Sequence, residues 1–185
     1  MTIHPLTPAD APEASREMLE GAARAFGFVP NLLGNMAHAP ALLEAYMAVA
    51  SAFNKTSLTP TERHIVLLTT SVRHGCTYCV AAHSATAGMQ KVPAPIVEAL
   101  RAGQPLADPK LDALRRFTLD TVESRGWPSE QTVRDFLGAG YTEAQALEVL
   151  VGIGQKTLSN YTNHLAGTPL DEAFATTRWN APATP

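Results

Sequence analysis

Residues 59–83 read TPTERHIVLLTTSVRHGCTYCVAAH, and this stretch decides the fold. It opens with a helix start: Thr59 can cap, Pro60 suits the first helical position, and Glu62 stands at the capping-box position. The run that follows, 65–72, is apolar around most of a helix and rich in β-branched residues. The cap and the lack of flanking turn residues favour a buried helix over a strand. The stretch therefore predicts two consecutive helices joined by a short turn.

The second of these helices carries the only two cysteines of the chain, Cys76 and Cys79, followed by His83. Residues three and four apart share a helix face, so both sulfurs and the imidazole line one stripe if Cys76 opens the helix. Unpaired N–H groups and partial positive charge at a helix N-terminus stabilise a thiolate and lower the thiol pKa from about 8.5. The histidine can accept or return the proton. This pattern is typical of a redox dithiol with an acid–base partner.

Other interpretations of the cysteines stay open at this point. They could be half of a zinc site with His83 as third ligand, although the other histidines offer no second ligand pair. They could also be inert core residues, because free cysteine is often buried as a small hydrophobe. A permanent disulfide is disfavoured, since it would close a very short loop and restrict the unfolded chain little.

Length and composition indicate one globular domain. The chain has 185 residues, 45% of them hydrophobic and 17% charged, which is enough to bury a real core. We expect a single domain over 1–185, with a core at about 25–175, a helix before it and a loose tail after 180. A net charge of −3 provides no basic field for nucleic acid or an anionic membrane. No apolar run is long enough for a membrane span.

The N-terminal residues indicate the compartment. They lack the charged-then-apolar pattern of a signal peptide. We therefore expect a cytoplasmic protein in a reducing environment, where a CxxC pair is more often catalytic than structural.

The rest of the chain predicts helix after helix, with proline or capping residues at the starts and glycine at many of the ends. No segment shows alternating strand patterning with hairpin residues. The predicted fold class is all-α. The expected helices cover approximately 12–26, 32–36, 40–50, 59–73, 76–88, 92–101, 108–125, 129–138 and 142–165.

A faint internal repeat relates the two halves of the chain. Thr142 and Gln145 repeat the capping pattern of Thr59 and Glu62, and the same offset sets the CTYC segment against SNYT. The identities are few, and two capped apolar helices always look somewhat alike. We take as a hypothesis that the chain has two weakly related helical halves, of which only the first carries thiols.

Several segments resemble the AhpD-like, carboxymuconolactone decarboxylase superfamily, and the resemblance covers most of residues 25–175. It implies an all-helical fold and a homo-oligomer, often a trimer or hexamer. Members with a CxxC pair reduce peroxides through a thiol–disulfide cycle, whereas the decarboxylase branch generally lacks the dithiol. The segments are FVPN at 28–31, APALLEA at 39–45, LTPTER at 58–63, GCTYCVAAHS at 75–84 and LSNYTNH at 158–164.

The resemblance implies roles for the dithiol. Cys79 would be the peroxidatic thiolate that attacks a hydroperoxide, and Cys76 would resolve the sulfenic acid to a disulfide. His83, one turn beyond Cys79, would exchange its proton. An external dithiol would then reduce the disulfide. The expected activity is a thiol peroxidase of antioxidant defence that uses neither a metal nor a bound cofactor.

The chain departs from the family at the proton relay. The relay glutamate commonly stands twelve residues before the first cysteine, and His64 holds that position here. Glu62 lies two residues earlier, about 200° away around a helix, so the two cannot serve the same spot. We expect Glu62 to cap the helix. Both Glu62 and His64 stay candidates for the proton relay. Arg73 and His74 are expected at the surface.

Two other classes of function remain. One is a general thiol–disulfide oxidoreductase without peroxide activity. Such a protein would be oxidised rapidly by disulfides but not by hydroperoxides. The other is a non-enzymatic helical oligomer with inert cysteines, in which both thiols would be alkylated slowly.

Overall fold

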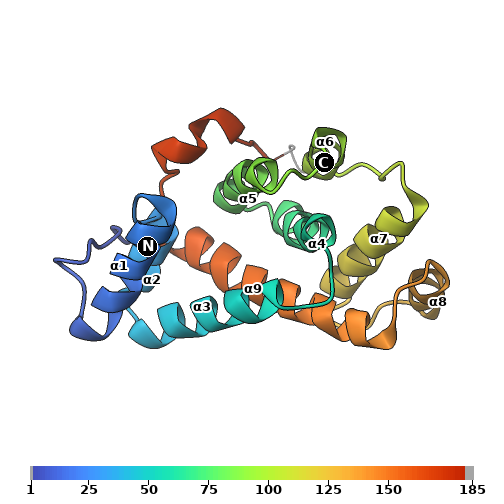
Figure 1. Ribbon diagram of the computed structural model, residues 1–185, viewed down its shortest axis with the longest axis horizontal. Helices are drawn as coiled ribbons and strands as arrows, with labels where there is room; N and C mark the ends of the chain where they lie inside the picture. Colours follow the sequence, from blue (N-terminus) through green and yellow to red (C-terminus); the bar gives the residue numbers. More distant parts are fainter. Residues whose placement is uncertain (1, 182–185) are drawn as a thin grey trace.

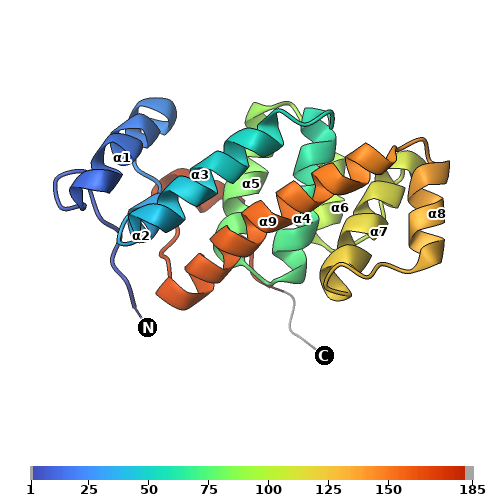
Figure 2. The same ribbon diagram turned by 90° about the horizontal axis from the view of Figure 1, so that it is seen from below.

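The computed structural model of the protein describes residues 2–181, which form helices and contain no strand. The all-α class predicted from the sequence is therefore confirmed. The helices form a body longer than it is wide, with α9 and α3 running along one side (Figure 1, Figure 2). Their bounds are α1 Glu13–Phe26, α2 Asn31–Met36, α3 Pro40–Asn54, α4 Pro60–Arg73, α5 Thr77–Met89, α6 Ala94–Arg101, α7 Pro109–Glu123, α8 Glu130–Gly138, α9 Glu143–Ala166 and the 3-10 helix η1 Glu172–Thr177.

Both capping boxes expected from the sequence are formed. The Glu62 backbone N–H donates to Thr59 Oγ1 at 3.2 Å, and the Thr59 N–H donates to Glu62 Oε2 at 2.8 Å. The second box has the same two bonds between Thr142 and Gln145, at 3.2 and 3.0 Å. Each box satisfies backbone donors that a helix start leaves unpaired. The starts of α4 and α9 are therefore set by local sequence.

Helix α4 lies at the centre of the molecule. It packs against α5, α6, α7 and α9, which surround it in Figure 1. Ile65, Val66 and Leu68 are fully buried, and burial of such side chains from all sides needs neighbours around most of the circumference. This enclosure explains why its sequence is apolar almost all round.

Helix α9 crosses α3 and α4 closely at Gly152. A Cβ atom at this position would lie 2.6 Å from Phe53 Cζ of α3 and 2.7 Å from Val66 Cγ1 of α4. Both neighbours are buried. Only glycine therefore fits at the crossing. Although α9 has 24 residues, no helix within residues 2–181 is both long and apolar enough to cross a membrane.

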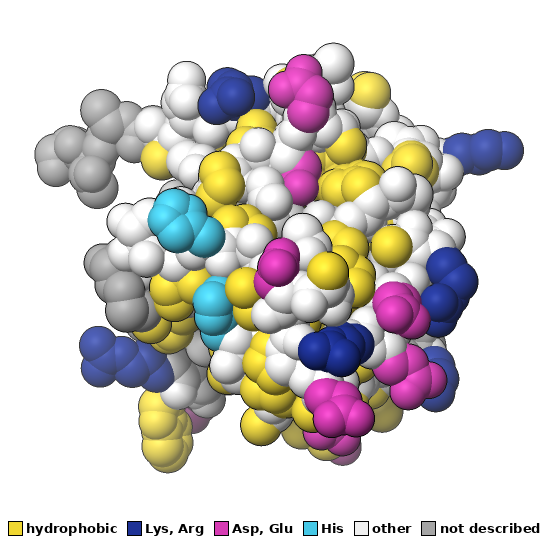
Figure 3. Space-filling view, turned by 90° about the vertical axis from the view of Figure 1, so that its left-hand side faces the viewer, with side chains coloured by type: hydrophobic (Ala, Val, Ile, Leu, Met, Phe, Trp, Pro, Cys, Tyr) yellow, Lys and Arg dark blue, Asp and Glu magenta, His cyan; other side chains and the backbone are white. Residues whose placement is uncertain are grey.

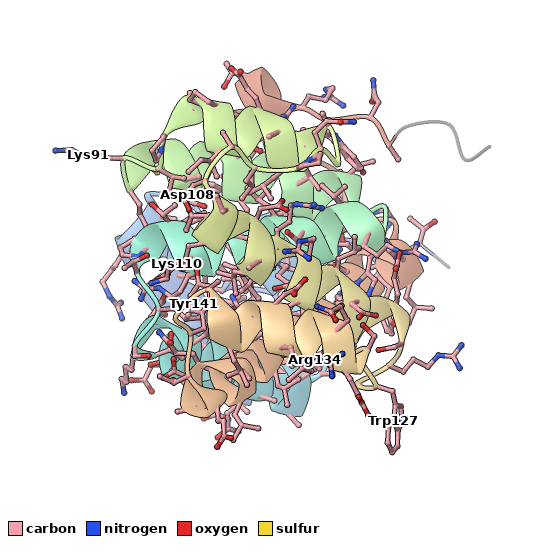
Figure 4. The ribbon with its side chains drawn as sticks, turned by 90° about the vertical axis from the view of Figure 1, so that its right-hand side faces the viewer. Lys91, Asp108, Lys110, Trp127, Arg134 and Tyr141 are labelled. Atoms are coloured by element: carbon pink, nitrogen blue, oxygen red, sulfur yellow. The ribbon has the colours of Figure 1, made fainter. Side chains whose placement is uncertain are left out.

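The start of α9 is held against α7 and α8 by stacked aromatic rings. The Phe136 ring stacks on Phe117 and Tyr141, with centroid distances of 4.3 and 4.6 Å. Lys110 Nζ lies 4.8 Å from the centroid of Tyr141, and Figure 4 shows the two side chains close together at this end of the molecule. Stacked and cation–π contacts of this kind add to the burial of the rings.

The C-terminal segment packs on α5 and α6, and its helix η1 was not expected from the sequence. Thr177 Oγ1 donates to the Ala81 carbonyl at 2.9 Å. Trp179 Nε1 donates to the Arg101 carbonyl at 2.9 Å. The packed chain therefore continues to Trp179. Residues 182–185, part of the tail expected to be loose, lie outside the described residues.

Candidate active site

The dithiol stands at the start of α5, as the spacing predicted. Gly75 has a φ of +67°, a conformation that favours glycine, and it turns the chain out of α4. Cys76 is the N-cap residue with φ −80° and ψ 95°, and its carbonyl accepts the N–H of Val80 at 3.0 Å. Cys79 follows in the first turn. Both thiols are free and buried.

Polar groups of α9 face the two sulfurs. Asn163 Nδ2 lies 3.2 Å from Cys79 Sγ and 3.7 Å from Cys76 Sγ. Ser159 Oγ lies 3.6 Å from Cys79 Sγ. Because the Asn163 amide can only donate through Nδ2, it favours sulfur as an acceptor. The Asn163 contact therefore favours the thiolate form of Cys79.

The two cysteines differ in ionisation and in access. Burial opposes ionisation of Cys79, but hydrogen bonding from Cys76, the charge of Lys156 and the contact with Ser159 hold the pKa of the Cys79 thiol well below its usual value. The hydrogen bond to Cys79 and then burial raise the pKa of the Cys76 thiol. Cys79 also lines a cavity that Cys76 does not reach. Cys79, at the cavity wall, is therefore the more acidic thiol of the pair, and Cys76 behind it is the less acidic one.

The cavity is lined by residues of α1, α2, α3, α4, α5 and α9, and η1 contributes Phe174. Its volume is about 440 Å³, within the range of small-molecule sites. Most of its lining is apolar, and no described carboxylate takes part. The titratable side chains of the lining, apart from tyrosine, are Arg63, His64, Cys79, His83 and Lys156.

The outer face near this end carries no uniform charge. Figure 3 shows the side of the molecule formed by α1 and its neighbours, with acidic, basic and hydrophobic side chains interspersed. A mixed surface of this kind provides no extended field of one sign. The electrostatics of the site therefore depend on the groups of the cavity itself.

His83 contacts a buried lysine instead of a sulfur. Lys156 Nζ lies 2.7 Å from His83 Nε2, and the lysine is fully buried. No hydrogen bond joins His83 to Cys76 or Cys79 within the described residues. Burial, and then the charge of Lys156 and the proximity of His64, hold the pKa of His83 well below its usual range. His83 is therefore a neutral imidazole at neutral pH.

His64 lies on the cavity side of α4. Its Nδ1 is 2.9 Å from the Pro60 carbonyl, and its Nε2 is 3.5 Å from Thr86 Oγ1. Its ring centroid is 6.2 Å from that of His83, too far for a direct hydrogen bond. Burial lowers the pKa of His64, so it too is neutral. The structure brings His64 and His83 to one cavity without linking them directly.

Glu62 points away from this cavity. Its Oε2 accepts from both the N–H and the Oγ1 of Thr59 at 2.8 Å. On the same side, burial and then the Glu62 carboxylate raise the pKa of Tyr141. Two residues apart on α4, Glu62 and His64 thus serve opposite sides of the helix, as the helical geometry predicted.

Arg73 and His74, both expected at the surface, differ in their exposure. Arg73 is exposed and forms an ion pair with Glu123 at 2.7 Å. His74 is only half-buried at the surface, and its Nδ1 lies 3.0 Å from Asn160 Oδ1. His74 is therefore at the surface only in part, because α9 passes over the turn that precedes α5.

Sequence reasoning missed Lys156 and Asn163, both on the buried face of α9. The internal repeat gave no hint of the lysine, because the offset sets Lys156 against exposed Arg73. A usable signal was present: Gly152, Lys156 and Ser159 share one helix face, where small residues indicate close packing. A lysine on such a face needs a specific partner.

The zinc interpretation required His83 beside both sulfurs. Within residues 2–181, no group of three or more His, Cys, Asp or Glu side chains is placed to hold one metal ion. The imidazole instead meets Lys156, a residue that cannot ligate a metal while it is protonated.

Comparisons with known proteins relate part of the chain to a protein family. Residues 40–120, from α3 into α7, match the carboxymuconolactone decarboxylase family. The resemblance found in the sequence is thus confirmed at the level of the superfamily for these matched residues. None of the curated proteins compared with the chain matches it.

Solved structures share the fold over almost the whole chain. A peroxidase-related protein with an alkylhydroperoxidase AhpD core from Ralstonia eutropha JMP134 aligns with a TM-score of 0.81 at 23% identity, covering 94% of this chain and 95% of that one. A Cys→Ala variant of the debrominase Bmp8, in complex with 2,3,4-tribromopyrrole, aligns with 0.80 at 20%, covering 96% and 95%. A peroxidase-related protein from Silicibacter sp. TM1040 aligns with 0.78 at 19%, covering 91% of each. At these identities the likeness concerns the fold, which does not by itself define an activity.

One prediction separates the two relay candidates. His64→Ala is expected to fold normally and to react with peroxide about tenfold more slowly, a loss of about 1.4 kcal/mol in transition-state stabilisation, because a base at the cavity wall is removed. Glu62→Ala is expected to keep its activity and to lose about 1 kcal/mol of unfolding free energy with the cap. Peroxide kinetics and urea unfolding of both variants measure these effects.

The matched control is Glu62→Gln. Gln145 occupies the same position in the second capping box, so a glutamine at 62 can still accept from Thr59. The control should unfold like the unmodified protein. A folded but inactive Glu62→Ala variant, together with a fully active His64→Ala variant, would place the relay on Glu62.

Proposed function

We propose that the protein is a thiol-dependent peroxidase that reduces hydroperoxides through the Cys76–Cys79 pair. The observation that carries the proposal is the asymmetry of the dithiol. Of the two cysteines, Cys79 is the one that lines the cavity, and it is also the one whose pKa is lowered. A nucleophilic cysteine needs this combination of thiolate character and access. Cys76, protonated and behind it, is suited to resolve the product.

The proposed cycle has three steps. The Cys79 thiolate attacks the distal peroxide oxygen, the O–O bond breaks, and the alkoxide leaves and takes up a proton. Cys76 then attacks the sulfenic acid at Cys79, which forms the disulfide and releases water. An external dithiol reduces the disulfide by exchange and restores both thiols.

The cavity supports an organic substrate. Its volume and apolar lining exceed what hydrogen peroxide requires, and Phe26, Tyr46 and Phe174 offer aromatic surface to a carbon skeleton. We therefore propose that organic hydroperoxides react faster than hydrogen peroxide.

Mass spectrometry of the reduced protein before and after one equivalent of cumene hydroperoxide tests the proposal. A loss of two protons localised to the peptide with Cys76 and Cys79 supports it. If disulfides oxidise the pair rapidly and hydroperoxides do not, the protein is a general thiol–disulfide oxidoreductase. If neither oxidises it and both thiols are alkylated slowly, the cysteines are inert.

The same cavity favours a second candidate, reductive dehalogenation of a haloaromatic compound. The Cys79 thiolate would take the halogen, and the carbanion left by the broken C–halogen bond would take up a proton. Attack of Cys76 on the sulfenyl halide would then form the disulfide and release halide. A cavity of about 440 Å³ accommodates such a ring. Release of one halide for each disulfide formed from a halopyrrole would identify this activity.

We propose that the protein is a homo-oligomer held by the outer face of α9. This face exposes four large hydrophobic residues, with exposed fractions between 46% and 66%: Leu147, Leu150, Tyr161 and Leu165. At 3.6 residues per turn they fall within about 60° of one another, so they form one apolar stripe. Light scattering at micromolar concentration should give a multiple of the monomer mass. A monomer at that concentration would contradict the proposal.

A further inference from the structure

Lys156 is a buried cation without a carboxylate partner. Its side chain is fully buried, and its one hydrogen bond within the described residues is to His83. The phenols of Tyr46 on α3 and Tyr78 on α5 line the cavity. The other titratable groups and the charged groups around it come from α4, α5 and α9, whereas α1, α2, α3 and η1 present no charged side chain to it. Those groups are Arg63, His64, Cys79 and His83, with His74 also close enough to sense the lysine.

The contact with Lys156 sets the tautomer of His83. A lysine ammonium can only donate, so Nε2 of the neutral imidazole must be the acceptor and the ring proton must sit on Nδ1. His83 lines the cavity, and the described residues offer Nδ1 no hydrogen-bond acceptor. The imidazole therefore has one side tied to a proton donor and the other side free to donate to a bound molecule.

We propose that Lys156 is the proton source for the leaving oxygen of the substrate and that His83 transfers the proton. The inference rests on the proposed peroxidase function. When the Cys79 thiolate takes the distal oxygen, the O–O bond breaks and the alkoxide receives the Nδ1 proton of His83. His83 Nε2 takes a proton from Lys156 in the same event. The products are the sulfenic acid, the alcohol and a neutral Lys156, so charge and protons balance.

The charge of the site explains why the proton comes from this lysine. Before the reaction the Cys79 thiolate and the Lys156 ammonium sum to zero. After it the sulfenic acid and the neutral amine again sum to zero. A proton taken from solvent would leave the ammonium buried in an apolar cavity without its counter-charge, which is costly. The Lys156 pathway avoids an uncompensated charge at every stage, and Lys156 recovers its proton when Cys79 returns to the thiolate.

The test compares two oxidants that differ in their leaving group. Cumene hydroperoxide releases a strongly basic alkoxide that needs a proton, whereas peracetic acid releases acetate, which does not. Stopped-flow oxidation of reduced Lys156→Met by each oxidant is measured across pH, and ultraviolet absorbance gives the thiolate fraction. We expect the rate with cumene hydroperoxide to fall about 100-fold, as for loss of a general acid. The rate with peracetic acid should fall only as far as the thiolate fraction falls.

Two further variants guard against simple misfolding. Lys156→Arg retains a cation but is a far weaker acid, and His83→Gln retains an acceptor for Lys156 but cannot relay a proton. Both should keep the thiolate and still lose reactivity selectively with cumene hydroperoxide. Circular dichroism checks that each variant is folded.

The outcomes separate the inference from the proposed function. If the unmodified protein reacts with both oxidants and the folded variants slow both equally after correction for thiolate, Lys156 is not the proton source. If the unmodified protein reacts with neither oxidant, the peroxidase function itself is overturned. A selective loss with cumene hydroperoxide in the folded variants supports both.

Discussion

Cys79→Ser is expected to abolish peroxide consumption, whereas Cys76→Ser should consume one equivalent and stop. The reason is the asymmetry of the pair: Cys79 lines the cavity and has the lowered pKa, and Cys76 lies behind it as a protonated thiol. Without Cys76 the sulfenic acid at Cys79 has no resolving partner. Dimedone labelling followed by mass spectrometry detects that sulfenic acid, and a peroxide assay measures turnover.

The two serine variants are controls for each other, because each removes one sulfur and keeps nearly the same volume. Dimedone should label Cys76→Ser after peroxide and leave Cys79→Ser unlabelled. The reverse pattern, with label only on Cys79→Ser, would exchange the roles of the two cysteines.

Gly152→Val is expected to have the largest effect on stability, a loss of about 3 kcal/mol of unfolding free energy. The added Cβ alone would lie 2.6 Å from Phe53 Cζ and 2.7 Å from Val66 Cγ1, so the crossing of α9 with α3 and α4 must open. Val66 is β-branched and buried and has little freedom to move aside. Urea unfolding measures the change.

Gly154→Ala is the matched control on the same helix. Apart from its chain neighbours and the backbone of α9 itself, no atom lies within 4 Å of a Cβ at this position, so the substitution should raise stability by up to about 1 kcal/mol through helix propensity. Gly152→Val with an unfolding midpoint at or above that of the unmodified protein would contradict the proposed tight crossing.

Most of the helical fold could be predicted from local sequence, because the decisive signals act within a few residues. Thr59 with Glu62 and Thr142 with Gln145 form their boxes as expected, and Gly75 turns the chain before α5. The 3-10 helix η1 was missed, since six residues carry too little periodicity to reveal it. Its position depends on contacts with α5 that are distant in sequence.

The candidate site also has a part that local sequence predicts and a part that it does not. Cys76, Cys79 and His83 lie within eight residues of one another, so helical spacing alone placed them at one helix, although His83 contacts Lys156 and not a sulfur. Lys156 and Asn163 reach the site only because α9 packs across α5. Their roles follow from tertiary structure, which no local spacing encodes.

Helix α9 makes the chemistry of the site depend on register. Gly152, Lys156, Ser159 and Asn163 follow one another at intervals of four, three and four residues, along about 16 Å of a single rigid helix. One residue inserted after Gly152 would turn the other three by about 100° while leaving both cysteines untouched in α5. The thiols would then lose their donors and His83 its lysine in one step. An insertion between Gly152 and Asn163 is therefore expected to disable the site, so the spacing between the glycine and the asparagine is as much a part of the site as the CxxC spacing itself.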